Sequence, residues 1–157
     1  MILSNKNQTK AGKRGKFRWI ILSVGIVLFS IAFLRKETMV AFLSFTIGAL
    51  GGFAVDYLGI RVLKLWTYPR QKFLKKEYFM LVIPGWGVFG MMVNLPLSWI
   101  QVSNEIALPM LMLSLFVFCE LPNIKIGTWK YNAPIWLIAL CWIPLILAFR
   151  FLFLYFF

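Results

Sequence analysis

Five apolar stretches of this chain are each long enough to cross a lipid bilayer, and only short polar connections separate them. A helix needs about 20 apolar residues to span roughly 30 Å of hydrocarbon. Backbone groups must be paired within the lipid, and these stretches lack the apolar/polar alternation of barrel strands. The sequence therefore predicts an all-α integral membrane protein, a bundle of five transmembrane helices. The spans are expected near residues 18–35, 38–60, 78–100, 105–122 and 134–155.

The composition indicates the same class of protein. Hydrophobic residues make up 61% of the chain and charged residues 14%, against about 25% charged residues in ordinary globular domains. The first apolar run, 19–34, exceeds the roughly 7–15 residues of a signal-peptide core, and R-K-E-T follows it where small residues would be expected. We interpret it as a retained span. Residues 1–17 are then expected to form a basic cytoplasmic tail, and residues 18–157 a single transmembrane domain.

Lysine and arginine residues set the expected orientation. Fourteen of them lie in the N-terminal segment and in the loops 61–77 and 123–133, whereas two lie in the first hairpin on the opposite side. Because cytoplasmic loops carry the excess of basic residues, we expect a multi-pass protein of the cell membrane, with the N-terminus inside and the C-terminus outside. Arg150 lies within the last span, where its side chain has the length to reach the outer interface.

The net charge of +12 raises nucleic acid as a possible partner. The basic residues, however, lie in short stretches between apolar runs, and attraction to anionic headgroups accounts for them. We therefore expect membrane lipid as a partner and no nucleic acid. The chain has no histidine, and Cys119 and Cys141 lie in apolar runs without metal-binding spacing. We expect no metal site and no cofactor.

Two of the five acidic residues stand in matching contexts. Asp56 lies near the end of the second expected span, before W-T-Y at 66–68, and Glu120 lies near the end of the fourth, before W-K-Y at 129–131. The next span then begins with P-G-W in one half and P-I-W in the other. We interpret spans 2–3 and 4–5 as a weak parallel repeat about an axis along the membrane normal, with both acids near the cytoplasmic face.

An ionisable residue within a transmembrane segment is costly and so indicates function. Asp56 and Glu120 are therefore the candidate catalytic residues, and ion pairs with Arg61 or Lys125 are the structural alternative. Glu120 is the stronger candidate because Pro122 is expected to end the helix beside it. Aromatic residues nearby either anchor the chain at the headgroups or bind substrate. The candidate substrate-binding residues are Trp129, Tyr131, Asn123, Trp66, Tyr68, Trp86 and Asn94.

Spans two and three each carry a stripe of small and polar residues at four-residue spacing. Small residues let helices approach closely, so the two stripes are expected to pack against each other, with Asp56 at the cytoplasmic end. Pro84 and Pro96 are expected to kink or break span three. The stripes consist of Ser44, Gly48, Gly52 and Asp56, and of Trp86, Gly90, Asn94 and Ser98.

The segment E-L-P-N-I-K-I-G-T-W-K-Y at 120–131 resembles a pattern in the membrane-embedded lycopene cyclase domains of bacteria, archaea and fungi. In that family an acidic residue near a helix end precedes a Trp-x-Tyr, often with glycine just before the tryptophan. Glu120 stands where the family usually has aspartate, and D-Y-L-G-I-R-V-L-K-L-W-T-Y is similar with one extra residue. The resemblance implies a small helical membrane domain that acts on a carotenoid. Trp86 and Gly87 occupy the place of the family's glutamate pair.

Three functions fit these observations. A non-enzymatic structural, assembly or partner-binding subunit fits the small size and the absence of a nucleophile motif, and it is the first expectation. The alternative is a membrane enzyme that acts on an isoprenoid or carotenoid by acid catalysis, with Trp and Tyr stabilising a carbocation. A second alternative is a small transporter or channel subunit that uses the acids as an ion site. The partner is accordingly a lipid-soluble ligand or another membrane protein.

Overall fold

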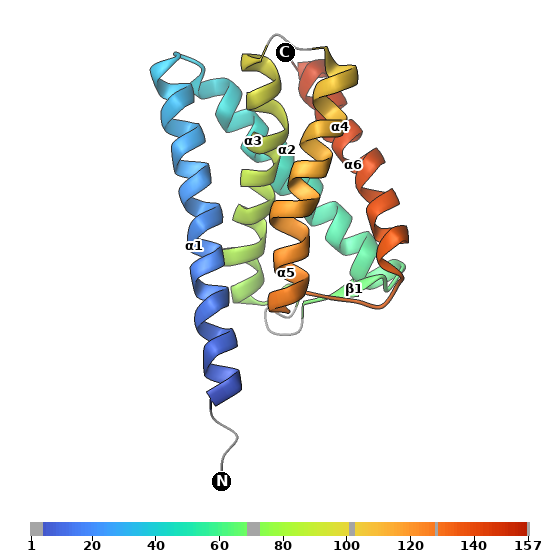
Figure 1. Cartoon of the computed structure of the whole chain (residues 1–157). Coiled ribbons are helices and arrows are strands. Elements are labelled where there is room, and N and C mark those ends of the chain that lie inside the picture. The colour runs from blue at the N-terminus through green and yellow to red at the C-terminus, as the bar shows by residue number, and fades with distance from the viewer. Residues whose placement is uncertain (1–4, 69–72, 101–102, 128, 157) are drawn as a thin grey trace.

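The chain folds into a bundle of helices that lie roughly side by side, and α1 extends beyond the others at one end (Figure 1). The computed structural model describes residues 5–68, 73–100, 103–127 and 129–156. Several long helices contain a π-helical segment, marked η. The helical elements are α1 (Asn5–Leu34), α2 (Thr38–Asp56), η1 (Tyr57–Val62), η2 (Tyr78–Val82), α3 (Ile83–Trp99), α4 (Asn104–Leu115), η3 (Phe116–Glu120), α5 (Leu121–Ile126) and α6 (Ile135–Phe156).

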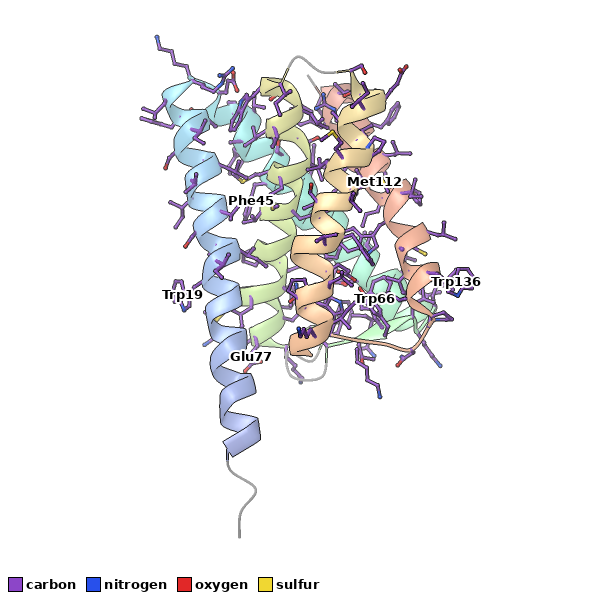
Figure 2. The ribbon with its side chains drawn as sticks, viewed as in Figure 1. Trp19, Phe45, Trp66, Glu77, Met112 and Trp136 are labelled. Atoms are coloured by element: carbon purple, nitrogen blue, oxygen red, sulfur yellow. The ribbon has the colours of Figure 1, made fainter. Side chains whose placement is uncertain are left out.

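The expected helical architecture is confirmed. Within the described ranges, three helices are long and apolar enough to cross a membrane: Thr38–Val62, Tyr78–Trp99 and Ile135–Phe156. Two shorter apolar helices, Trp19–Leu34 and Asn104–Leu115, accompany them. Large apolar side chains cover the outside of the bundle, which is the surface that lipid requires. Figure 2 shows two of them, the tryptophans at positions 19 and 136, pointing outward on opposite sides.

Helix α1 begins at Asn5, well before the expected start of the first span at residue 18. Most of the segment expected as a tail is therefore helical. Lys, Arg, Gln and Ala in this segment are good helix formers, and extending an existing helix costs far less than nucleating a new one. The apolar part of α1 thus provides the start from which the basic part can continue.

The expectation that prolines break the third span and end the helix beside Glu120 is wrong, because the chain stays helical through Pro84, Pro96 and Pro122. Pro84 occupies the first turn of α3 and Pro122 the first turn of α5, positions where the missing N–H costs little. Each follows a π-helical segment, so the chain stays helical through both prolines. Pro96 also lies inside α3 without ending it. Helix α5 ends instead at Gly127, whose φ of 72° is the left-handed conformation that glycine adopts easily.

Helices α2 and α3 pack through the expected stripes. Gly48 and Gly90 face each other so closely that a Cβ added to Gly48 would meet the Gly90 Cα at 2.8 Å and would also clash with the Trp86 carbonyl. Ser44, Gly48 and Asp56 on α2 are buried, as are Gly90 and Asn94 on α3, whereas Ser98 at the end of the α3 stripe is exposed. The contact of small residues confirms the predicted pairing of these two helices.

The two Trp-x-Tyr segments form a short antiparallel ribbon at one end of the bundle (Figure 1). Strand β1 is Trp66–Thr67 and strand β2 is Lys130–Tyr131, with Trp66 opposite Tyr131. Asn132 extends the pairing, because its backbone N–H donates to the Leu65 carbonyl at 2.8 Å. The ribbon joins the loop after α2 to the loop after α5.

The opposite end of the bundle is tied by Glu37. The Trp99 indole N–H donates to its carboxylate at 2.6 Å, and the Arg35 Nε donates to it at 3.3 Å. The Arg35 guanidinium also lies over the Trp99 ring, 5.6 Å from the centroid. This cluster fastens the α1–α2 turn to the end of α3. Arg150 on α6 is buried at 8% exposure, and its guanidinium lies over the Phe153 ring, 5.4 Å from the centroid.

Substitution of Gly48 tests the close α2–α3 contact. Gly48→Ala should lower the free energy of unfolding by about 1–3 kcal/mol, because the added methyl group must push the two backbones apart. Gly85→Ala on α3 is the matched control, since a Cβ there meets no atom within 4 Å. The control should be neutral or slightly stabilising. Thermal unfolding of both variants in the same detergent measures the difference, and equal destabilisation would contradict the packing described.

Candidate functional site

The carboxyl group of Asp56 accepts hydrogen bonds from four aromatic side chains. The indole N–H groups of Trp66 and Trp86 donate to Oδ1 and Oδ2, at 3.0 and 2.8 Å. The Tyr78 hydroxyl donates to Oδ2 at 2.9 Å, and the Tyr68 hydroxyl lies 3.0 and 3.1 Å from the two oxygens. Indole nitrogens can only donate, and an ionised carboxylate is the form that can accept from all four groups. We call these five residues the Asp56 cluster.

Two glycines on the helix that bears Asp56 make room for the indoles. Gly52 lies one turn before Asp56, and a Cβ there would overlap the ring of Trp86. Gly59 lies about one turn after Asp56, and a Cβ there would overlap the ring of Trp66. Both glycines are buried. The small-residue stripe of α2 therefore makes room for the Trp86 ring at Gly52, in addition to allowing α2 to pack on α3.

Tyr68 lies in the loop beyond the span and keeps its proton. Burial raises the pKa of its phenol well above the ordinary value, and the neighbouring Asp56 carboxylate raises this pKa further. The protonated phenol can donate, and so Tyr68 is a lasting partner for Asp56 at physiological pH.

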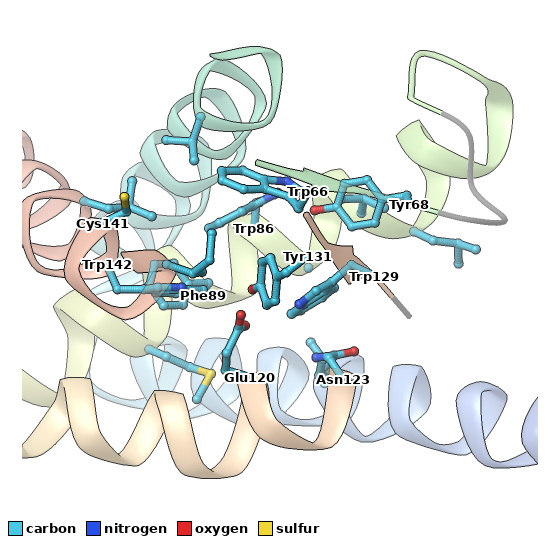
Figure 3. A pocket seen from close by; sticks show the side chains of 18 residues that line it. Trp66, Tyr68, Trp86, Phe89, Glu120, Asn123, Trp129, Tyr131, Cys141 and Trp142 are labelled. Atoms are coloured by element: carbon cyan, nitrogen blue, oxygen red, sulfur yellow. The ribbon is translucent and has the colours of Figure 1, made fainter. Parts of the chain in front are cut away.

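Beside the Asp56 cluster lies a cavity of about 150 Å³, and seven of the side chains that line it are aromatic (Figure 3). The rings contact one another around it. Trp86 stacks on Trp142 with centroids 6.0 Å apart, and Phe89 meets Trp142 edge-on at 5.2 Å. Tyr68 and Trp129 meet edge-on at 6.1 Å on another side. Such mutual contacts hold the aromatic walls in fixed orientations.

The structure brings most of the sequence candidates to this one cavity. Asp56 lies directly behind its wall, bonded to three of the lining residues. Asn94 is the exception, because it lies two turns farther along α3 than Trp86, buried and outside the cavity lining. The candidates that line the cavity are Trp66, Tyr68, Trp86, Glu120, Asn123, Trp129 and Tyr131.

Glu120 reaches into the cavity from the end of η3 (Figure 3). Its side chain is 1% exposed, and within the described ranges neither carboxyl oxygen has a hydrogen-bond partner. The Trp129 indole is close enough to interact electrostatically with this carboxyl group, yet its N–H does not reach hydrogen-bond geometry. Asp56 and Glu120 therefore differ sharply: both oxygens of Asp56 accept hydrogen bonds, whereas those of Glu120 accept none from the described residues.

The acids and Tyr78 sit where the helices change to π-helical geometry. Asp56 directly precedes η1, Tyr78 begins η2 and Glu120 ends η3. A π-helical turn adds a residue to the turn and redirects the side chains beside it, and such segments are frequent at functional sites. Two of the three π-helical segments contribute lining residues to the cavity: Leu81 and Val82 from η2, and Glu120 from η3.

The structural alternative of ion pairs is wrong for the described residues, where neither acid lies at ion-pair distance from a cation. The Arg61 guanidinium instead lies over the Phe73 ring, 5.7 Å from its centroid. Lys125 is exposed on α5. No group of three or more His, Cys, Asp or Glu residues that could hold a metal occurs in the part of the chain that the structure describes.

The sequence analysis missed several residues of the site. Tyr78 was not a candidate, although its hydroxyl is one of the four donors to Asp56. Phe89 and Trp142 were also missed, because a buried aromatic residue in an apolar span looks like ordinary core. Phe89 follows Trp86 by three residues and so shares its helix face, which is the one sequence signal that could have indicated it.

Comparisons of the chain with protein-family models, with curated proteins and with solved structures find no match.

Replacement of Asp56 tests the cluster. Asp56→Asn should lower the free energy of unfolding by about 3 kcal/mol, because the amide has one acceptor oxygen and turns its NH₂ group toward donors. Glu105→Gln, at an exposed acid on α4, is the matched control and should change little. Tyr78→Phe in the Asp56→Asn background should cost less than in the wild type. The free energy of unfolding of the two single variants and the double variant is measured by thermal unfolding. If the loss in the double variant equals the sum of the two single losses, Asp56 and Tyr78 are not coupled.

Proposed function

We propose that this chain is a membrane enzyme that binds an unsaturated, lipid-soluble substrate in the aromatic cavity and protonates it with Glu120. The observation that carries the proposal is the buried Glu120 carboxyl group, which faces the cavity without a hydrogen-bond partner in the described ranges. A carboxyl group in such surroundings keeps its proton, because burying its unpaired charge costs far more than burying the neutral acid. Glu120 is therefore available as a proton donor.

The proposed reaction needs no group beyond the carboxyl and the substrate. The Glu120 proton passes to one carbon of a C=C bond, and the π electron pair of that bond forms the new C–H bond. The adjacent carbon becomes cationic. Loss of a proton from its neighbour to the Glu120 carboxylate restores the acid and leaves a shifted double bond. If a second double bond attacks the cation first, its π electron pair forms the ring C–C bond and leaves a new cationic carbon, and loss of a proton from the neighbour of that carbon to the Glu120 carboxylate ends the reaction.

The cavity walls suit a cationic intermediate. Indole and phenol rings carry negative charge on their faces and attract a cation, by about 0.5–1 kcal/mol at exposed sites and about 2 kcal/mol or more where water is excluded. Trp66 and Trp86 are held by Asp56, whose negative charge lies just behind these rings. The polar groups that could capture the cation are few, since the lining is mostly apolar.

The resemblance to lycopene cyclase domains supports the same chemistry. Glu120, Trp129 and Tyr131, which carry that resemblance, all line the cavity. An aromatic cavity beside a lone acid favours the enzyme over the non-enzymatic subunit that the sequence alone had put first. A carotenoid or another linear isoprenoid is the substrate class that the proposal names. The glutamate pair of the family has no counterpart here, and Glu120 takes the acid role alone.

We place the enzyme in the cell membrane as five spans, with the N-terminus inside and the C-terminus outside. The basic residues around the ribbon end of the bundle support this orientation. The proposed repeat of spans 2–3 and 4–5 is supported by the pairing of β1 with β2 and by the position of each acid beside the tryptophan of its own half.

Cysteine labelling tests the orientation. On a Cys-free background, Leu74→Cys should react with a membrane-impermeant maleimide only after the cells are permeabilised. Glu105→Cys, in the first turn of α4 at the opposite end of the bundle, should react in intact cells. Both positions are exposed in the structure, so a difference reports sidedness. Labelling of position 74 in intact cells would reverse the topology.

Deuterium transfer tests the role of Glu120. The purified protein in nanodiscs is incubated with acyclic polyenes, lycopene and squalene, in D₂O buffer, and the hydrocarbons are analysed by mass spectrometry. The wild type should place solvent-derived deuterium on carbon. Glu120→Gln should reduce this incorporation by about 10²–10⁴-fold, because the amide cannot donate a proton as an acid.

The control separates chemistry from folding. Gln is nearly isosteric with Glu and adds no charge, so the Glu120→Gln variant should unfold at a temperature close to that of the wild type. Glu105→Gln should retain full incorporation, since this acid is exposed on α4. Incorporation by Glu120→Gln at the wild-type rate would exclude Glu120 as the acid.

A further inference from the structure

Arg150 is a buried charge that the proposed reaction does not use. It lies within the apolar helix Ile135–Phe156, and it is not part of the cavity lining. Its Nε and Nη1 atoms are enclosed and have no hydrogen-bond partner in the part of the chain that the structure describes. The third nitrogen, Nη2, is not among the enclosed atoms. The guanidinium group thus reaches the surface on one side.

The described residues supply no countercharge to Arg150. The ion pair that they contain joins Arg35 to Glu37, in the turn between α1 and α2. Glu105 lies in the first turn of α4, which contacts α6, but it is exposed and is not at ion-pair distance from Arg150. The face of the Phe153 ring attracts the positive charge, yet it leaves most of the N–H groups without an acceptor. The guanidinium group therefore keeps unused donors.

The chemistry of the guanidinium group indicates what is missing beside it. A charged side chain within a membrane helix is costly, and such a residue normally pairs with an opposite charge or with acceptor oxygens. Arginine stays protonated and has five N–H donors and no acceptor. Its planar fork matches two oxygens of one phosphate or carboxylate group. The partner that fits Arg150 is an oxyanion with two acceptor oxygens.

The surface next to Arg150 is apolar. Leu147 and Leu154 are its neighbours on the helix, one turn before and one turn after it, and they are 47% and 51% exposed. Exposed apolar side chains on a membrane helix contact acyl chains. An oxyanion that reaches Arg150 across this surface therefore comes from the bilayer.

Arg150 lies near one end of its span. It is six residues before Phe156, the last residue of α6, which is about 9 Å along the helix axis. Tyr155 in the final turn is 76% exposed, and tyrosine is enriched at the headgroup level of membranes. An arginine near a helix end extends toward the interface, and the bilayer thins locally toward a charge. The oxyanion found at that level is the phosphate group of a phospholipid.

We propose that Arg150 binds the phosphate group of a phospholipid from the leaflet at the end of α6, with Nη2 and one adjacent nitrogen as donors and with the acyl chains along Leu147 and Leu154. This inference rests on the membrane class of the chain and is independent of the proposed reaction. It assigns a lipid site to the charge inside the last span, at the end of the bundle away from the basic loops.

Photolabelling locates the lipid. The full chain is purified in mild detergent and incubated with a phosphatidylglycerol that carries a diazirine in its acyl chain, close to the glycerol. After irradiation, adducts are mapped by mass spectrometry. The wild type should be labelled on α6 between Leu147 and Leu154. A diacylglycerol with the same diazirine chain, which lacks the phosphate, should label this segment about tenfold less, because a hydrogen bond to a charged group is lost.

Two substitutions separate the site from general charge effects. Arg150→Met, which removes the charge and keeps an unbranched side chain, should reduce phosphatidylglycerol labelling of this segment about tenfold. Lys36→Gln is the matched control, because Lys36 is an exposed cation at the same end of the bundle, and it should leave the labelling unchanged (Figure 1). Arg150→Met should unfold in lipid-free detergent at or above the wild-type temperature, since a buried unpaired charge is removed. Arg150→Lys, which keeps the charge without the planar fork, should give intermediate labelling.

Four results would overturn the inference. Wild-type labelling of Arg150→Met would show that this residue does not hold the lipid, and equal labelling by the diacylglycerol would show that the phosphate contributes nothing. Competition by sodium phosphate would assign the site to the free ion instead of the lipid. A membrane protein that copurifies stoichiometrically with the wild type and is lost from Arg150→Met would show that a protein carboxylate occupies the site.

Discussion

The hydrogen bonds to Asp56 are the interaction on which this end of the bundle depends. They gather donors from the loop after α2 and from the following helix onto one buried carboxylate. A buried charge is tolerated only when its acceptor capacity is filled, and four donors fill it. Because Trp66, Tyr68 and Trp86 are donors and cavity walls at once, the same bonds that stabilise the fold also shape the site.

The two acids show how one local pattern can serve two purposes. Asp56 has donors on both oxygens, and Glu120 has none within the described ranges. The first half of the chain contributes Tyr78 and Trp86 to its acid, whereas the corresponding groups of the second half leave a cavity around Glu120. A saturated acid holds a structure in place, and an unpaired one is free to exchange a proton with a bound molecule.

Helix packing and the site are linked through small residues. Gly48 allows α2 and α3 to touch, and Gly52 and Gly59 admit the two indoles. Larger residues at these positions would separate the helices and displace the aromatic walls together. Gly85 differs, since open space lies where its side chain would be. Glycine therefore has two roles in this chain: Gly48, Gly52 and Gly59 allow close contacts, and Gly85 adjoins open space.

The sequence by itself determined the helical membrane class, the pairing of α2 with α3 and the two acids as the points of interest. Apolar runs and four-residue spacing are local patterns, and burial in lipid allows few structures that satisfy the backbone. The tertiary structure alone decided that the two Trp-x-Tyr segments pair, that Tyr78 and Trp142 belong to the site and that Asn94 does not. It also decided that Pro84 and Pro122 lie in the first turns of α3 and α5, each directly after a π-helical segment, where a missing N–H costs little. Such outcomes depend on contacts between segments far apart in the chain, where residue type alone cannot distinguish a wall of the cavity from the core.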